Sequence, residues 1–243
     1  MRNRERTIMK NESRLGLLIF LTTLGTLAAG TVFAQDPEMQ QKVADLKQAM
    51  ATNKQALAQY TWVEQDTISL KGEEKKQEHF QVRLGPDGKP QKTSLDPPPD
   101  NSGHEGRLKK HIVEKKKEEY KEYADSIKTL IQQYVPPEKD LIEQARQQGN
   151  VTMGPAGAPG EFRLVISNYL KQGDNMTLVV DKAQLQLTSL SISTYLSDPS
   201  DAVNVTVQFS RVPGGPSHVS SETINGVSKQ LTINVQNSNY QHL

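Results

Sequence analysis

The fold is decided by the stretch LQLTSLSISTYLSDPSDAVNVTVQFSRV, which runs from Leu185 to Val212. Small apolar residues alternate there with Ser, Thr, Gln and Asn, and the short segment SDPSD interrupts the alternation. A period of two is typical of β-strands, because successive side chains point to opposite faces of a sheet. The stretch therefore predicts two strands, each with one polar face and one apolar face that needs a cover.

The same alternation continues on both sides of this stretch, from Glu161 to the end of the chain. Its phase slips at Thr188–Ser189, which predicts a β-bulge. The segment PGGP at 213–216 predicts a turn between two of the strands. Short strands joined by short turns favour antiparallel neighbours, so we expect five or six antiparallel strands in this half of the chain.

The first half of the chain mixes helices and strands. Apolar residues at three- and four-residue steps predict an amphipathic helix over 36–60, and period two over 61–95 predicts a hairpin or a three-stranded meander. A Pro-rich loop separates the meander from a helical insertion at about 105–148, and the segment GPAGAPG at 154–160 predicts a turn-rich loop. These elements predict an α+β domain whose antiparallel sheet is covered by the N-terminal helix and the insertion.

Residues 1–34 have the three-part pattern of a secretory signal peptide. A basic leader precedes the uncharged run LGLLIFLTTLGTLAA at 15–29, and small residues end the segment at Ala34. We expect cleavage near Ala34 and a mature domain over 35–243, in the periplasm or secreted. Retention of the segment as a membrane anchor is the alternative, although ~20 apolar residues are usual for a span.

Composition excludes some classes of protein. Of the 29 Lys and Arg and 28 Asp and Glu residues, five basic and two acidic residues lie in 1–34, so 24 basic and 26 acidic residues follow. That balance argues against a nucleic-acid partner. The chain has no Cys, which excludes disulfides, thiol catalysis and Cys-based metal sites.

Three segments resemble a known superfamily: LVVDKAQLQLTSLSIS at 178–193, DAVNVTVQFSRVPGG at 201–215 and LTINVQNSNY at 231–240. With a helix leading into YTWVEQ at 60–65, they resemble the periplasmic lipoprotein-carrier and outer-membrane lipoprotein-sorting superfamily over about 36–95 and 161–240. The resemblance implies a curved antiparallel sheet, or half-barrel, with helices as a lid. Its members carry acylated lipoproteins or lipids, and others sense envelope stress; no ligand-contacting residue is carried over.

The sequence contains no catalytic or metal-binding motif that we would assign. The five His residues lack metal-ligand spacing, no Gly-x-Ser-x-Gly elbow is present, and GPAGAPG lacks the Lys of a phosphate-binding loop. We therefore expect neither a catalytic residue nor a metal nor a cofactor, and we expect a protein that is not an enzyme.

The leading hypothesis is a carrier that holds a lipid, an acyl chain or a lipoprotein between the sheet and the helices. A strongly curved sheet is difficult to fill with one helix, which favours a ligand space. Four aromatic residues are the candidates for lining it: Trp62, Phe80, Phe162 and Tyr169.

The alternative is an interaction or stress-sensing module of the envelope with a packed core and no ligand. Its candidate surface is the basic run RLKKHIVEKKK at 107–117, which would contact an envelope protein or an anionic membrane surface. A solvated helix face balanced by the acidic residues that follow is the simpler interpretation of this run. The contact candidates are Lys109, Lys110, Lys115, Lys116 and Lys117.

Overall fold

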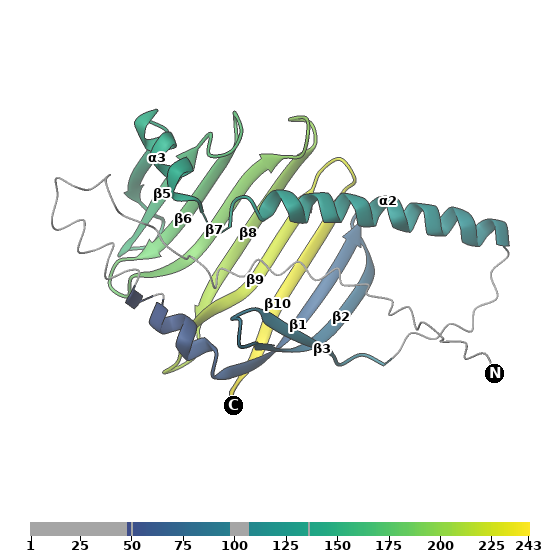
Figure 1. Ribbon diagram of the computed structural model, residues 1–243, viewed down its shortest axis with the longest axis horizontal. Helices are drawn as coiled ribbons and strands as arrows, with labels where there is room; N and C mark the ends of the chain where they lie inside the picture. The colour runs from purple at the N-terminus through teal and green to yellow at the C-terminus, as the bar shows by residue number, and fades with distance from the viewer. Residues whose placement is uncertain (1–47, 50, 98–106, 136) are drawn as a thin grey trace, which may run out of the picture.

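The computed structural model describes residues 48–49, 51–97, 107–135 and 137–243. Ten strands form one antiparallel sheet in the order β3-β2-β1-β10-β9-β8-β7-β6-β5-β4 (Figure 1). The strands are β1 (Tyr60–Leu70), β2 (Glu73–Leu84), β3 (Pro90–Ser94), β4 (Val151–Pro155), β5 (Glu161–Ser167), β6 (Asn175–Asp181), β7 (Gln186–Tyr195), β8 (Ala202–Arg211), β9 (Ser217–Gly226) and β10 (Leu231–His242).

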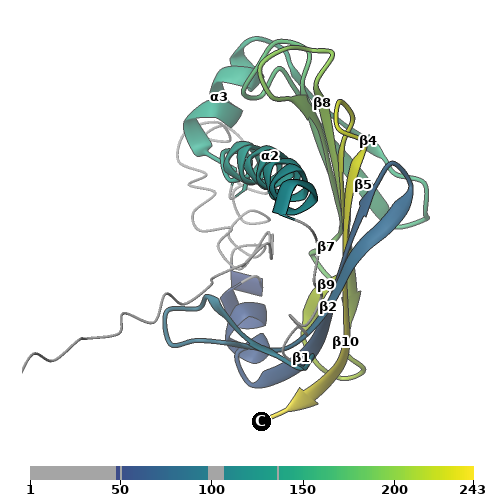
Figure 2. The same ribbon diagram turned by 90° about the vertical axis from the view of Figure 1, so that its right-hand side faces the viewer.

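The helices lie on one side of this sheet. They are α2 (Arg107–Ile131), α3 (Lys139–Gln147) and the helical residues 51–57. Figure 2 shows that the sheet is open and bends around them, so that the helices occupy its concave side. The predicted α+β class with an open antiparallel sheet is confirmed.

Alternation along the strands produces one inner, apolar face. Buried residues at every second position of the central strands pack against α2, whose buried side chains include Ile127 and Ile131. The inner core residues of the strands are Ile68, Ile166, Met176, Leu178, Leu190, Ile192, Val203, Val205, Val207, Ile224, Leu231, Ile233 and Val235. The apolar face inferred from the Leu185–Val212 stretch is therefore covered by the protein's own helices over much of its area.

Several local predictions are confirmed by the register of the strands. The meander at 61–95 is the strand series β1, β2 and β3, and its PDGK turn places Gly88 at a φ of +72°. The bulge lies at the predicted position, since Val179 pairs with Ser189 and Val180 pairs with Leu187, leaving Thr188 without a counterpart on β6.

Helix α2 crosses the sheet at Gly226 on β9. A Cβ atom at this position would lie 2.6 Å from Tyr123 and 2.7 Å from Ile127. Only a glycine allows the helix to approach the strand this closely without moving it. Helix α2 therefore packs directly on the strands. Together with α3 it forms the insertion that the sequence predicts at about 105–148.

One segment differs from the prediction. The turn-rich loop predicted at 154–160 begins inside β4, because Val151–Pro155 pairs with β5. Pro155 is tolerated there since β4 is the last strand of the sheet, where one edge has no ladder to complete.

Several predictions fall outside the described residues. The signal peptide over 1–34, the first part of the 36–60 helix and the loop over 98–106 belong to this group. Among the residues that are described, no helix is long and apolar enough to cross a membrane.

Candidate functional site

The inner face of the sheet changes character from one edge to the other. One row of paired residues makes the change visible, because each member lies opposite the next on the neighbouring strand. In order from β2 to β5 the row is Glu78, Asp66, Val235, Glu222, Val207, Leu190, Leu178 and Leu164. Three of the four residues from β2 to β9 are acidic, whereas the part from β8 to β5 is entirely apolar.

An apolar strip follows this row on the side away from Gly226, and we define it as Phe162, Leu187, Phe209 and Val219. Phe162 and Leu187 pair with the same residue, Val180, and Phe209 pairs with Val219. All four strip residues keep partial exposure, while their neighbours in the central core are buried. The apolar inner face therefore continues past the part that the described helices bury.

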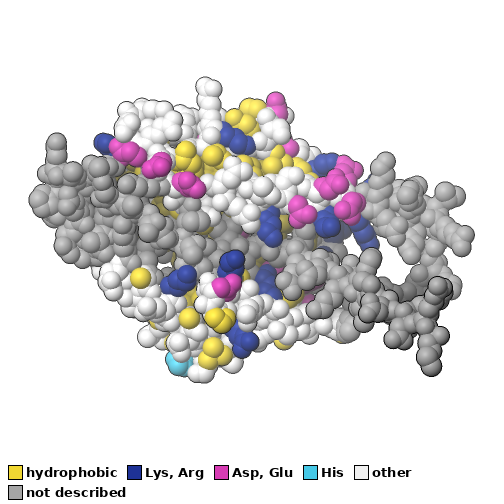
Figure 3. Space-filling model, viewed as in Figure 1, with side chains coloured by type: hydrophobic (Ala, Val, Ile, Leu, Met, Phe, Trp, Pro, Cys, Tyr) yellow, Lys and Arg dark blue, Asp and Glu magenta, His cyan; other side chains and the backbone are white. Residues whose placement is uncertain are grey.

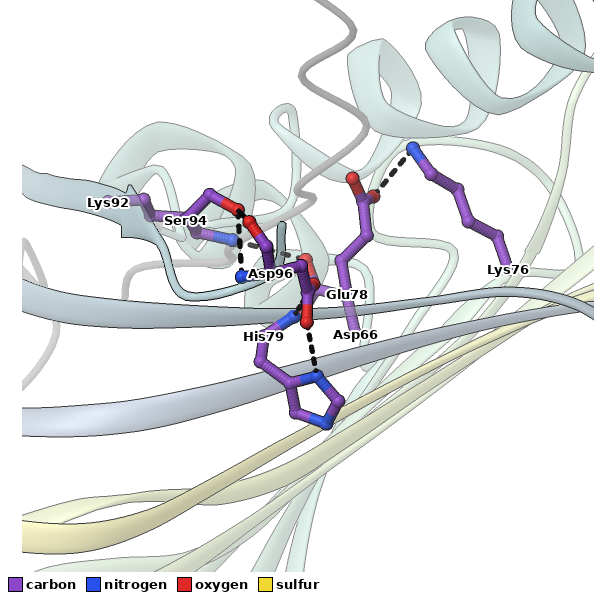
Figure 4. Close-up of polar contacts among 7 residues, drawn as sticks. All are labelled: Asp66, Lys76, Glu78, His79, Lys92, Ser94 and Asp96. Atoms are coloured by element: carbon purple, nitrogen blue, oxygen red, sulfur yellow. Dashed lines mark hydrogen bonds and ion pairs between the residues drawn. The ribbon is translucent and has the colours of Figure 1, made fainter. Parts of the chain in front are cut away.

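The acidic part of the inner face contains a buried polar group, which we call the Glu64 set: Glu64, Asp66, Lys92 and Asn237. Glu64 is 0% exposed and Asp66 is 2% exposed. Both lie on the inward face of β1, between the apolar residues Trp62 and Ile68 of that face. The strand therefore carries two carboxyl groups into the interior. Lys92 of β3 forms an ion pair with Glu64. Figure 4 shows its contact with Asp66, in which Nζ of Lys92 lies 3.3 Å from Oδ2 of Asp66.

Two further polar contacts beside the Glu64 set lie on opposite faces of β2. Glu78, next to Asp66, forms an ion pair with Lys76 at 2.8 Å on the helix side of the strands (Figure 4). The ring of His79 lies on the opposite side, where its Nδ1 is 2.9 Å from Oδ1 of Asp96. Two hydrogen bonds from His79 lower the pKa of Asp96, an exposed carboxyl outside the Glu64 set.

Burial controls the protonation of Glu64. Removal from water raises its pKa from 4.5 to about 8, and the negative charge of Asp66 acts in the same direction. The positive charge of Lys92 and its hydrogen bond lower the pKa of Glu64, but the effect of burial is larger and the pKa stays raised. Burial therefore disfavours the ionised form of Glu64 even beside the ammonium of Lys92.

The Glu64 set holds more hydrogen-bond acceptors than donors. Within the described part of the chain, Oε2 of Glu64, Oδ1 of Asp66 and Oδ1 of Asn237 accept no hydrogen bond, although all three atoms are buried. Asn237 lies opposite Glu64 on β10, and its Nδ2 donates to the carbonyl oxygen of Val219 at 3.1 Å. Most buried polar groups in proteins have partners, so three unpaired acceptors at one place require an explanation.

A second buried polar network lies at the other end of the sheet, under the C-terminal end of α2. Asp174 is 0% exposed and accepts four hydrogen bonds. Its donors are the backbone N–H groups of Tyr169 (2.6 Å), Leu170 (3.0 Å) and Lys171 (2.8 Å) and the hydroxyl of Tyr134 (2.6 Å). Burial, together with the Asp174 acceptor, raises the pKa of Tyr134 above its ordinary range, so the phenol stays a donor.

The structure places the four predicted lining residues in three locations. Trp62 and Phe80 belong to a second core cluster with Leu57, directly beside the Glu64 set; Trp62 stacks on Tyr240 with ring centroids 5.4 Å apart, and Phe80 lies 5.0 Å from the ammonium of Lys92. Phe162 belongs to the apolar strip. Tyr169 is 3% exposed and its hydroxyl accepts a hydrogen bond from the backbone of Glu138 at 2.6 Å, which fixes the start of α3.

The five predicted contact lysines all lie in the first half of α2, and Figure 1 shows that this half projects beyond β1 and β2. The side chains of Lys116 and Lys117 are exposed, whereas those of Lys109, Lys110 and Lys115 are outside the described set. Acidic residues accompany them, since Glu118 lies 3.7 Å from Lys121 and Glu119 pairs with Lys229. Figure 3 shows basic and acidic side chains intermixed on this side of the molecule.

The sequence analysis did not predict the polar chemistry of the inner face, because it assigned no role to Glu64 or Asp66. A signal for it was present in YTWVEQDTISL, since Glu64 and Asp66 share their parity with Trp62 and Ile68. Acidic residues at the apolar positions of an alternating strand indicate buried charge. Among the described residues, no group of three or more His, Cys, Asp or Glu side chains is arranged to hold a metal ion.

Comparisons with known proteins add little to this geometry. No family model matches the chain, and no curated protein matches it. A solved structure of a DUF1329 family protein from Desulfovibrio piger ATCC 29098 is similar to it with a TM-score of 0.37 and 8% sequence identity. The alignment covers 83% of this chain and 90% of that protein, and a TM-score this low carries no argument about function.

Proposed function

We propose that the protein is an exported, non-enzymatic carrier that binds the acyl chain of a lipid or lipoprotein between the concave face of the sheet and the helices. The observation that supports the proposal is the apolar strip. Its four residues lie on the inner face next to the core, yet they retain partial exposure. An acyl chain lying along the strip would remove that apolar surface from water at about 25 cal/mol per Å².

The test is the stability of delipidated protein with added dodecanoate or a synthetic lipopeptide. Because a ligand that binds only the folded state stabilises it by mass action, a concentration of about 100 times Kd adds about 2.7 kcal/mol and raises Tm by several degrees. The absence of any shift, together with the absence of lipid in mass spectra of the purified protein, contradicts the carrier function.

Variants connect this measurement to the apolar strip. Phe162→Ala removes an aromatic side chain from the strip and is expected to reduce the ligand-induced rise in Tm. Leu187→Glu places a charge on the strip and is expected to abolish that rise. Val227→Glu is the matched control, because Val227 is 50% exposed and lies in the turn between β9 and β10. Equal shifts in all three variants would place the ligand elsewhere.

Export is the second part of the proposal and rests on the pattern of residues 1–34. Expression of the full chain in a bacterial host, followed by fractionation and N-terminal sequencing, is expected to give a periplasmic protein that begins after Ala34. A full-length product in the membrane fraction would favour the retained anchor.

An envelope interaction or stress-sensing module is the alternative function, favoured by the projecting half of α2. Under this alternative, Lys116→Glu combined with Lys117→Glu abolishes crosslinking to an envelope protein, or binding to vesicles that contain anionic lipid, without affecting acyl-chain binding. The carrier function predicts the reverse sensitivity, with acyl-chain binding lost in the strip variants only.

A further inference from the structure

The Glu64 set lies directly beside the apolar strip. Asn237 donates to the carbonyl oxygen of Val219, a strip residue, and the hydroxyl of Tyr240 donates to the same oxygen at 3.2 Å. The buried acceptors and the partly exposed apolar surface are therefore neighbours on one face. A ligand that extended along the strip past Val219 would therefore end beside Asn237 of the Glu64 set.

The chemistry of that end follows from what the Glu64 set lacks. The ammonium of Lys92 already contacts Oε1 of Glu64, donates to Oδ2 of Asp66 and lies over the ring of Phe80. Three acceptor atoms are left, on Glu64, Asp66 and Asn237. When Glu64 is protonated, its O–H can donate to the side chain of Asp66, and the amide oxygen of Asn237 is then the one acceptor of the three that stays unmatched. An ammonium group has three N–H donors for these three atoms, and its positive charge favours the ionised form of Glu64.

We infer that Glu64, Asp66 and Asn237 form a headgroup subsite that selects amphiphiles with a primary ammonium group. This inference rests on the proposed carrier function and specifies its substrate class. An anionic headgroup is disfavoured at this place, because it would bring a further negative charge to two buried carboxyl groups. A quaternary ammonium carries the charge but has no N–H donor, so the acceptors would stay unmatched.

The test compares three probes of one chain length with the wild-type protein: dodecylammonium, dodecyltrimethylammonium and dodecanoate. Calorimetry below the micellar concentration is expected to show dodecylammonium binding about 10- to 100-fold more tightly than the other two, the effect of one buried charge-assisted hydrogen bond. Equal affinities for all three probes overturn the headgroup inference and leave the carrier function standing. No binding of any probe overturns the carrier function itself.

Variants assign the preference to the named side chains. Glu64→Gln and Asp66→Asn are expected to bring the affinity for dodecylammonium to within about threefold of that for dodecanoate, through loss of the charge-assisted bonds. The control is Glu78→Gln, which removes a negative charge from the adjacent position of the same face, where Lys76 already pairs with it. A preference that survives both Glu64→Gln and Asp66→Asn overturns the assignment. The wild-type comparison of the three probes decides the question on its own if either variant does not fold.

A last arm separates an amphiphile from a free polyamine. Spermidine carries ammonium groups and no acyl chain, so it is expected to bind at least about tenfold more weakly than dodecylammonium, which buries apolar surface along the strip. Spermidine binding as tight as that of dodecylammonium would overturn the assignment to amphiphiles.

Discussion

Two buried carboxyl sites, one in the β5–β6 loop and one on β1, differ in how well their hydrogen-bonding capacity is satisfied. Asp174, near the end of α2, accepts three backbone N–H groups and the hydroxyl of Tyr134. Glu64, on β1, has Lys92 as its ion-pair partner and a pKa raised to about 8 by burial. The same chemical group therefore has four hydrogen-bond donors in one place and is short of donors in the other.

This difference indicates different roles. A buried network with every member paired stabilises and orients the elements that it joins, and Asp174 joins the β5–β6 loop to Tyr134, which follows the end of α2. A buried carboxyl group with missing donors lowers stability in the empty protein, and such groups are concentrated at functional sites. The comparison agrees with a structural role for the Asp174 network and with the headgroup subsite that we infer at the Glu64 set.

The largest expected effect comes from breaking the satisfied site. Asp174→Ala leaves the N–H groups of Tyr169, Leu170 and Lys171 without an acceptor in a buried loop. We expect a loss of about 3–5 kcal/mol in the free energy of unfolding, measured by urea denaturation. Asp198→Ala is the control, because this exposed carboxylate caps its own loop through Ser200 and is expected to leave the urea midpoint nearly unchanged. Similar losses of unfolding free energy in the two variants would contradict a structural role specific to Asp174.

The second prediction concerns the pH dependence of stability that Glu64 produces. Its pKa is about 8 in the folded protein and 4.5 ordinarily, so between these values the folded state binds more protons than the unfolded chain. The contribution of Glu64 to stability is therefore fully present below pH 4.5 and is lost as the pH rises to about 8, by up to about 1.4 kcal/mol per pH unit.

Glu64→Gln removes this titration. We expect the variant to have a flatter curve of unfolding free energy against pH and to be more stable than the wild type at pH 8, as measured by denaturation at a series of pH values. Glu78→Gln, which alters a partly exposed carboxyl in an ion pair, should keep the wild-type slope. An unchanged slope in Glu64→Gln would show that Glu64 is not the group responsible.

The smallest expected effect sharpens the comparison inside the Asp174 network. Tyr134→Phe removes a hydroxyl that bonds Asp174 and also lies 2.6 Å from Oγ1 of Thr194, while the three backbone donors to Asp174 are retained. We expect a loss of about 1–2 kcal/mol, smaller than that of Asp174→Ala, in the same urea measurement. A loss as large as that of Asp174→Ala would mean that the tyrosine, and not the backbone donors, carries the network.

The strands, the helical insertion and the bulge could be predicted because each leaves a local mark. Alternation identified β7 and β8, and the phase slip at Thr188–Ser189 located the bulge, because one extra residue on a strand inverts the faces that follow. Strand β4 was missed, because Gly154 and Pro155 indicate a turn unless a neighbouring strand supplies the pairing, as β5 does here.

The candidate site depended more on tertiary structure. Glu64 and Asp66 stand next to each other on β1, but Lys92 comes from β3 and Asn237 from β10, so only sheet pairing brings them together. Of the predicted lining residues, Phe162 lies on the apolar strip, Trp62 and Phe80 lie beside the Glu64 set, and Tyr169 is used to position α3. Aromatic composition identified apolar interior residues without separating these uses.

The sequence by itself determined the α+β class, the antiparallel strands with their bulge and the presence of a helical insertion, because these follow from the spacing of residues along the chain. Only the tertiary structure decided which strands became neighbours, that α2 is seated on Gly226, and that one carboxyl is satisfied while another is not. The physical reason is that burial and hydrogen-bond partners come from residues far apart in the chain, and periodicity reports the face of a residue but not what lies across from it.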